Sequence, residues 1–180
     1  MTRIARAREL IGKPVLTLDQ ATYAGEVRDV LIDPYSSRMI GFTVRGRGLL
    51  SPPLVGMLPA GMIAAIGRDA VMISTFDVLV DESEGADTML AEQDDVIGKE
   101  AVSAAGASLG KVSDVILELR GGTATVVGYE LAAHSGQSLI VPMPEGVAVS
   151  GDALVVPQDA EGRAATGLAS FRDALERTRG

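Results

Sequence analysis

Two aspartates with the same neighbours are the residues of this chain that most resemble a catalytic or metal-binding pair. Asp29 stands in a Gly-x-Val-x-Asp-Val pattern at 25–30, and Asp114 stands in the same pattern at 110–115. Two carboxylates that converge in a pocket could transfer protons or hold a cation. No histidine or second acid accompanies both aspartates. We therefore predict a structural role, in which each carboxylate accepts hydrogen bonds within its own unit.

The remaining candidates for chemistry are weaker. His134 is the only histidine and lies in the polar segment 133–136, so we predict a solvated loop residue rather than a metal ligand. Gly46-Arg47-Gly48 lacks the full glycine pattern of a nucleotide site and is better explained as a hairpin tip. The chain has no cysteine, which excludes disulfides and thiolate chemistry. The sequence thus predicts no catalytic, cofactor-binding or metal-binding residue, and a protein that is not an enzyme.

The aspartate pattern belongs to a repeat that covers most of the chain. Ile11-Gly12-Lys13 returns at 97–99, Gly41-Phe42 returns as Gly128-Tyr129, and Asp69-Ala70 returns at 152–153. Self-similarity at a nearly constant spacing predicts two copies of one structural unit. We expect one domain at 1–76, an acidic linker at 77–94, a second domain at 95–157 and a tail at 158–180.

Each copy has the pattern of an all-β unit. Short apolar strands are expected at 15–18, 26–32, 40–44 and 71–73, and again at 101–104, 111–117, 127–131 and 154–156. In the third strand of each copy, alternation predicts one apolar face, formed by Ile40, Phe42 and Val44 in the first copy and by Val127, Tyr129 and Leu131 in the second. Short strands separated by glycine and proline turns are typical of a small barrel.

The tail has a helical period. Leu168, Phe171 and Leu175 follow the i, i+3, i+7 spacing and predict a short amphipathic helix over about 165–178. Its apolar stripe must dock on a barrel or on another subunit.

Charge and hydropathy limit the possible partners. The net charge is −8, and residues 77–95 carry eight acids and no base, which argues against a general nucleic-acid binder. Residues 48–67 are uncharged and long enough to span a bilayer, but Pro52, Pro53 and Pro59 interrupt them and the matching segment of the second copy is polar. The first residues lack the apolar stretch of a secretory signal. We therefore expect a cytoplasmic protein.

The repeated residues resemble the PRC-barrel family, which is named after a domain of the photosynthetic reaction centre H subunit and includes a domain of a ribosome maturation factor. The resemblance rests on Ile11-Gly12-Lys13, the 25–30 pattern, the Asp33-Pro34 turn, Gly41 and the 67–71 segment, most of which the second copy repeats. It implies a small all-β barrel that makes protein–protein contacts and has no shared active site.

Together these observations predict two small PRC-like β-barrels in tandem, followed by a short C-terminal α-helix. The expected function is a non-enzymatic adaptor or scaffold that binds a protein of unknown identity and needs no cofactor, and self-association stays open. Two alternatives also remain open. They are an RNA-associated ribosome-assembly factor and a peripheral component of a membrane complex.

The copies differ most in the segment after their third strand. Gly41 and Pro59 are separated by 18 positions, whereas Gly128 and Pro142 are separated by 14, and the extra residues of the first copy are apolar. We predict that this hairpin binds a partner, because exposed apolar patches mark contact sites. The residues assigned to this contact are Leu49, Leu50, Leu54, Val55, Met57, Arg45 and Arg47. Packing of the same residues within or between the barrels is an equally supported alternative.

Overall fold

Strands dominate the computed structural model, which describes residues 2–33, 36–46, 56–80, 96–143, 149–150 and 153–179. The first part of the chain forms β1 (Thr2–Arg6), β2 (Pro14–Thr17), β3 (Tyr23–Asp33), β4 (Arg38–Arg45), β5 (Gly56–Pro59), β6 (Ile63–Ile66) and β7 (Val71–Ile73). The second part forms β8 (Glu100–Ser103), β9 (Ser108–Arg120), β10 (Thr123–Ala132), β11 (Ser138–Pro142), β12 (Val149–Ser150) and β13 (Ala153–Val156). Helices α2 (Gln158–Glu161) and α3 (Leu168–Arg179) follow. The all-β prediction is confirmed.

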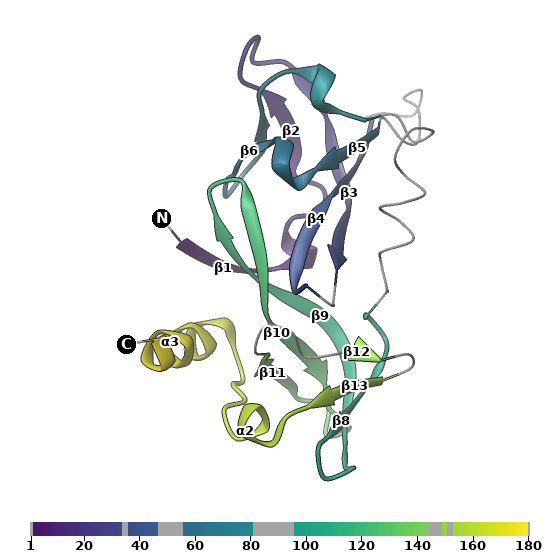
Figure 1. Cartoon of the computed structure of the whole chain (residues 1–180), viewed down its shortest axis with the longest axis vertical. Helices are drawn as coiled ribbons and strands as arrows, with labels where there is room; N and C mark the ends of the chain where they lie inside the picture. Colours follow the sequence, from purple (N-terminus) through teal and green to yellow (C-terminus); the bar gives the residue numbers. More distant parts are fainter. Residues whose placement is uncertain are drawn as a thin grey trace.

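The two copies share one strand arrangement. In the first, β2, β3, β4 and β5 pair antiparallel in chain order, and β7 pairs with β6 and, in parallel, with β2. In the second, β8, β9, β10 and β11 pair in the same way, and β13 pairs with β12 and, in parallel, with β8. Figure 1 shows the first copy above the second. The repeat in the sequence is therefore a repeat of folded units.

The N-terminal strand crosses between the copies. β1 pairs antiparallel with β9 of the second copy, from Thr2 opposite Arg120 to Arg6 opposite Ile116. The β9–β10 turn in return reaches the first copy, where the Ile66 amide donates to the Gly121 carbonyl at 2.8 Å. Residues 2–6, which precede the first copy in the chain, add a strand to the second copy. The two barrels are thus interlocked, as the crossing of β1 in Figure 1 shows.

The repeated glycines of the Gly-x-Val pattern allow a close approach between strands. Gly25 and Gly110 have φ of +146° and +124°, values that side-chain-bearing residues rarely adopt. A Cβ at Gly25 would lie 2.7 Å from the Arg45 carbonyl oxygen, and one at Gly110 would collide with the Ala132 carbonyl oxygen. Both positions must therefore stay without a side chain.

A β-bulge in each copy changes the predicted strand faces. The register of β3 and β4 jumps from Leu31–Gly41 to Ile32–Met39, which leaves Ile40 as the extra residue. Phe42 and Val44 lie in the main core with Met39, whereas Ile40 packs on a separate cluster. The prediction that Ile40 shares a face with Phe42 and Val44 is wrong, because strict alternation does not survive a bulge.

The second copy has the equivalent bulge. The register of β9 and β10 jumps at Val127, which packs with Ile116 and Ile140 instead of joining Tyr129 and Leu131 in the main core. The expectation of one face for these three residues is wrong for the same reason.

A single hydrophobic core runs through both copies. Its fully buried members include Leu10 and Phe42 of the first copy and Leu131 and Leu154 of the second. Burial of a large aliphatic or aromatic side chain contributes about 1.5–3 kcal/mol. Because the core is continuous, each copy contributes to the stability of the other.

Helix α3 covers a second, smaller cluster. Phe171 is fully buried against Ile116, Val127 and Ile140, and Leu168 and Leu175 pack around it as partly buried residues. A Cβ at Gly128 would lie 2.8 Å from the Phe171 ring, so that glycine leaves the space that the ring occupies. The helix begins three residues later than the predicted 165–178, and its apolar stripe lies on the second barrel.

Candidate protein-interaction surfaces

Residues 2–9 form an N-terminal arm, and two of its arginines contact acidic residues of the second copy. Arg6 donates from Nε to Oε2 and from Nη2 to Oε1 of Glu130, at 2.7 and 2.8 Å, and Arg8 Nη2 reaches Oε2 at 3.2 Å. The Ser138 hydroxyl adds a hydrogen bond of 2.6 Å. The bond from Arg6 is the main cause that lowers the pKa of Glu130 to about 2, although burial opposes it. This cluster fixes the arm to the second barrel.

The same arm contacts one of the repeated aspartates. Asp114 Oδ1 accepts hydrogen bonds from the amides of Val115 and Arg8 at 2.8 and 3.3 Å, and Oδ2 lies 3.1 Å from Arg8 Nε. Burial is the largest influence on this carboxyl and raises its pKa, against the effect of these contacts. Asp114 is thus a buried anchor for the arm.

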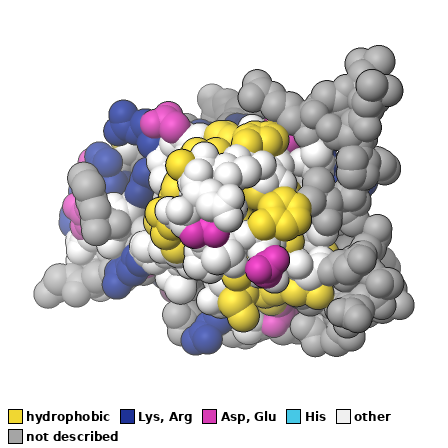
Figure 2. Space-filling view, turned by 90° about the horizontal axis from the view of Figure 1, so that it is seen from above, with side chains coloured by type: hydrophobic (Ala, Val, Ile, Leu, Met, Phe, Trp, Pro, Cys, Tyr) yellow, Lys and Arg dark blue, Asp and Glu magenta, His cyan; other side chains and the backbone are white. Residues whose placement is uncertain are grey.

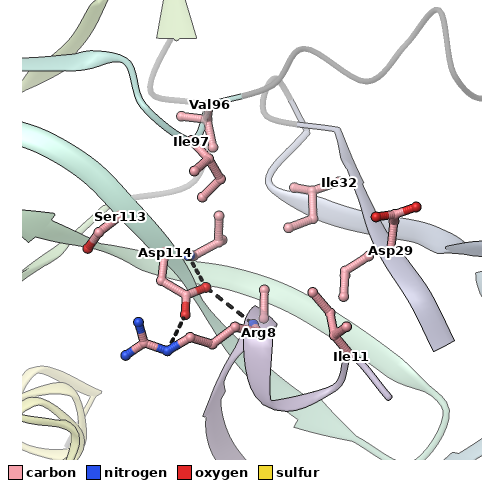
Figure 3. A pocket seen from close by; sticks show the side chains of 11 residues that line it. Arg8, Ile11, Asp29, Ile32, Val96, Ile97, Ser113 and Asp114 are labelled. Carbon is pink, nitrogen blue, oxygen red and sulfur yellow. Dashed lines mark hydrogen bonds and ion pairs between the residues drawn. The ribbon is translucent and has the colours of Figure 1, made fainter. Parts of the chain in front are cut away.

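The other repeated aspartate has different partners. Asp29 Oδ2 accepts a hydrogen bond from the Thr43 hydroxyl at 2.9 Å and lies 3.3 Å from Arg28 Nε, and its side chain is half exposed. Figure 3 shows Asp29 and Asp114 on opposite sides of the pocket that both line. The described residues include no group of three potential metal ligands. The two carboxylates therefore lack the convergence that a shared cation or proton transfer needs.

The pocket between the copies is mostly apolar. It has a volume of about 350 Å³ and is lined from both copies by equivalent residues, among them Ile11 with Ile97 and Val30 with Val115. In Figure 3 the isoleucine side chains extend into the space between the two barrels. Ile11 and Ile97 are each nearly half exposed. The pocket is a concave apolar surface that exists only because two copies are joined.

His134 lies on the surface with two polar neighbours. Its Nε2 is 2.7 Å from the Ser108 hydroxyl and 3.6 Å from Glu100, and its side chain is 67% exposed. The Ser108 hydroxyl and the Glu100 carboxylate both face the same nitrogen of the His134 ring, Nε2. In a nucleophilic triad, the acid orients the second nitrogen of the ring. The arrangement therefore does not activate Ser108.

A second apolar surface covers the outer end of the first barrel. Leu18 after β2, Met62 after β5 and Phe76 after β7 are 60%, 52% and 51% exposed. Figure 2 looks onto this end and shows hydrophobic side chains gathered on it with a few acidic ones between them. We call Leu18, Met62 and Phe76 the outer-end patch. Thr17 and Ile63, the neighbours of Leu18 and Met62 in the chain, both pair with Ile73, which brings the three residues to the same end of the sheet. Half-exposed side chains of this size, placed together, are typical of a protein contact.

The outer-end patch belongs to the first copy alone. At the repeat spacing, its three residues correspond to Ala104, Glu145 and Asp159 of the second copy. Our prediction of the contact did not include these three positions. The sequence does contain a signal for them, because a residue-by-residue comparison of the two copies shows large apolar residues at these positions in the first copy alone.

The predicted partner-binding hairpin lies only partly in the described residues. Leu49, Leu50, Leu54, Val55 and Arg47 fall outside them, so their assignment stays a prediction. Arg45 ends β4 and pairs with Glu26 at 2.7 Å. Met57 is 1% exposed and packs on Leu31 and Ile40 in the barrel, so its side chain is not available to a partner.

The described ends of β4 and β5 lie at the same end of the first barrel as the outer-end patch. Arg45 pairs with Glu26 and Val44 with Gly56, so the strands flanking the hairpin end where β3 begins, next to the turn after Leu18.

Two similar β-barrels that share one core, with a strand of the first part paired to the second, define the chain as a tandem β-barrel protein. The family model of the PRC-barrel domain matches residues 3–85 and again 90–163. The chain therefore belongs to the PRC-barrel family and contains two such domains in tandem. PRC-barrel domains are protein-interaction and scaffold domains and are in general not catalytic.

No curated protein matches the chain. In the part of the chain that the structure describes, no helix is long and apolar enough to cross a bilayer.

Proposed function

We propose that this protein is a non-enzymatic cytoplasmic adaptor that binds a protein partner through the outer end of its first barrel. The observation that carries the proposal is the outer-end patch, in which Leu18, Met62 and Phe76 are all at least half exposed, whereas the equivalent positions of the second copy hold no large apolar residue. Exposed apolar groups of this size cost solubility, so their concentration at one end indicates that a partner covers them.

The interlocked barrels suit a scaffold. β1 and the shared core fix the second barrel to the first, so a partner at the outer end is held in a defined position relative to the rest of the molecule. A preorganised surface binds with a smaller loss of conformational entropy than a mobile one.

The test compares substitutions in the patch with a matched control. Leu18→Ser combined with Phe76→Ser removes two anchors, and Val155→Ser removes a valine of the second barrel that is 44% exposed. Proteins captured from the native host are identified by mass spectrometry, and the strongest one is purified and titrated by calorimetry. Loss of a buried aromatic anchor costs 2 kcal/mol or more in a hot spot, so we expect affinity to fall by about 30-fold or more in the double variant.

The control variant should bind like the natural protein. All three proteins should unfold at the same urea concentration, since the changed residues are exposed. Equal partner affinity for the double variant and the natural protein would contradict the proposal. Leu49→Ser with Leu50→Ser is the parallel test of the hairpin prediction.

A further inference from the structure

Three arginines surround a groove whose lining residues do not include those of the outer-end patch. The groove lies between β1, the β6–β7 turn and α3, which Figure 1 places next to one another on one side of the molecule. It has a volume of about 540 Å³, and its lining consists of Thr2, Arg3, Ile4, Ile66, Arg68, Leu168, Ala169 and Arg172. These elements come from three distant parts of the chain, so the groove exists only in the folded protein.

No acid lines this groove, although acids outnumber bases in the chain by 24 to 16. Arg3 Nη2 donates to the Gly67 carbonyl at 3.1 Å, which holds the guanidinium beside Arg68. Among the described residues, no carboxylate forms an ion pair with Arg3 or Arg68. Arg172 has only Asp173 at 3.9 Å, and because both side chains are more than half exposed this pair is weak. The three positive charges are therefore available to a ligand.

The floor of the groove is apolar. Ile66 is buried. Ile4 and Leu168 are partly buried and pack against the hydrophobic cluster that contains Phe171. A ligand that fills the groove must therefore present an aliphatic group to the floor and anionic groups to the rim. An acidic peptide segment with interspersed aliphatic residues has both.

Other anionic partners fit the molecule less well. A nucleic acid or an anionic membrane presents an extended negative surface, which a protein with net charge −8 repels beyond a local cluster of three arginines. A short peptide segment contacts the cluster alone. The planar guanidinium donates two parallel hydrogen bonds to a carboxylate, which gives orientation as well as attraction.

We propose that the groove formed by Arg3, Arg68 and Arg172 binds an acidic, aliphatic-containing segment of a protein partner. This site shares no lining residue with the outer-end patch and adds a second, charge-selective contact to the adaptor. Its ligand is chosen by complementarity of charge at the rim and of apolar surface at the floor.

The test uses a fluorescein-labelled peptide, Glu-Leu-Glu-Glu-Leu-Glu, titrated with the full-length protein and followed by fluorescence anisotropy. We expect binding that weakens as salt rises from 50 to 300 mM, because the contact is electrostatic. The variants Arg68→Ala and Arg172→Ala should each weaken binding by about fivefold, in line with about 1 kcal/mol for a charged contact at the surface. Arg28→Ala removes the same charge elsewhere and should leave the affinity unchanged.

A peptide with Gln in place of every Glu should not bind. The proposal is overturned if the acidic peptide fails to bind, or if Arg28→Ala weakens its binding as much as the groove variants do. Tighter binding of a single-stranded RNA or of phosphatidylglycerol vesicles, lost in the groove variants, would also overturn the assignment to a peptide. Leu18→Ser with Phe76→Ser should leave peptide binding intact, so failure here and failure of the proposed function are distinguishable.

Discussion

Arg6 and Glu130 form a two-pronged ion pair across 124 positions of the chain, with Nε–Oε2 at 2.7 Å and Nη2–Oε1 at 2.8 Å. The pair joins the N-terminal arm to the second copy, and it is asymmetric. Glu130 stands where the first copy has Thr43, opposite the repeated aspartate in both cases. At the repeat spacing, Arg6 and Arg8 correspond to Glu92 and Asp94. Only the residues before the first copy are basic, and only the second copy carries the acid at this position, so the sequence provides this ion pair in one combination of segment and barrel.

Replacement of Arg6 should show how much its ion pair with Glu130 contributes to the free energy of unfolding. Glu130 is 4% exposed, so Arg6→Ala leaves a buried carboxylate with fewer donors, and we expect a loss of about 2 kcal/mol in the free energy of unfolding. Arg28→Ala removes an exposed pair with Asp29 and should cost less than about 0.5 kcal/mol. Urea unfolding measures both. A double-mutant cycle with Glu130→Gln should show coupling above about 1 kcal/mol, and additive effects would contradict the pairing.

Glu130 should also make stability depend on pH in the acid range. Its pKa is about 2 in the folded protein against an ordinary value of 4.5, so its contribution is complete above pH 5 and is lost as the pH falls toward 2. The shift corresponds to a contribution on the order of 3 kcal/mol. The measurement is urea unfolding at pH 7, 5, 4 and 3.

Asp114 acts in the opposite direction. Burial raises its pKa, so acid favours the folded state through this group and partly offsets the loss at Glu130. The Glu130→Gln variant separates the two effects. Its stability should decline less between pH 5 and 3 than that of the natural protein, and an equal decline would show that other carboxylates dominate.

Gly110 should tolerate no side chain. Gly110→Ala places a methyl group against the Ala132 carbonyl at a φ of +124°, and we expect a loss of about 3 kcal/mol or more. Gly106→Ala is the matched control, because Gly106 also has positive φ, +84°, but nothing lies within 4 Å of its added Cβ. That change should cost about 1 kcal/mol. Similar melting temperatures for the two variants would argue against the close approach of the strands.

Phe171 should account for most of the attachment of α3. Phe171→Ala removes a fully buried ring and should cost about 3–5 kcal/mol or free the helix from the barrel. Glu176→Ala changes an exposed residue of the same helix and should be close to neutral. Amide hydrogen exchange of residues 168–179 distinguishes local detachment from global unfolding. Unchanged protection in Phe171→Ala would contradict the packing seen here.

The strand positions and the repeat could be predicted from the sequence because they depend on local patterns. Val71–Ile73 and Ala153–Val156 are short apolar runs rich in valine and isoleucine, and the apolar stripe of Leu168, Phe171 and Leu175 marked a helix. The faces of Ile40 and Val127 could not be predicted in the same way. A bulge depends on the register with the partner strand, which no single strand encodes.

The sequence by itself determined the class of the fold and the duplication, since periodicity and repetition can be read along the chain. The tertiary structure decided the pairing of β1 with the second copy, the pairing of Arg6 with Glu130, and the gathering of Leu18, Met62 and Phe76 at one end. These relationships join residues that are dozens of positions apart. They depend on strand pairing and on packing between distant segments, which have no signature in a linear pattern.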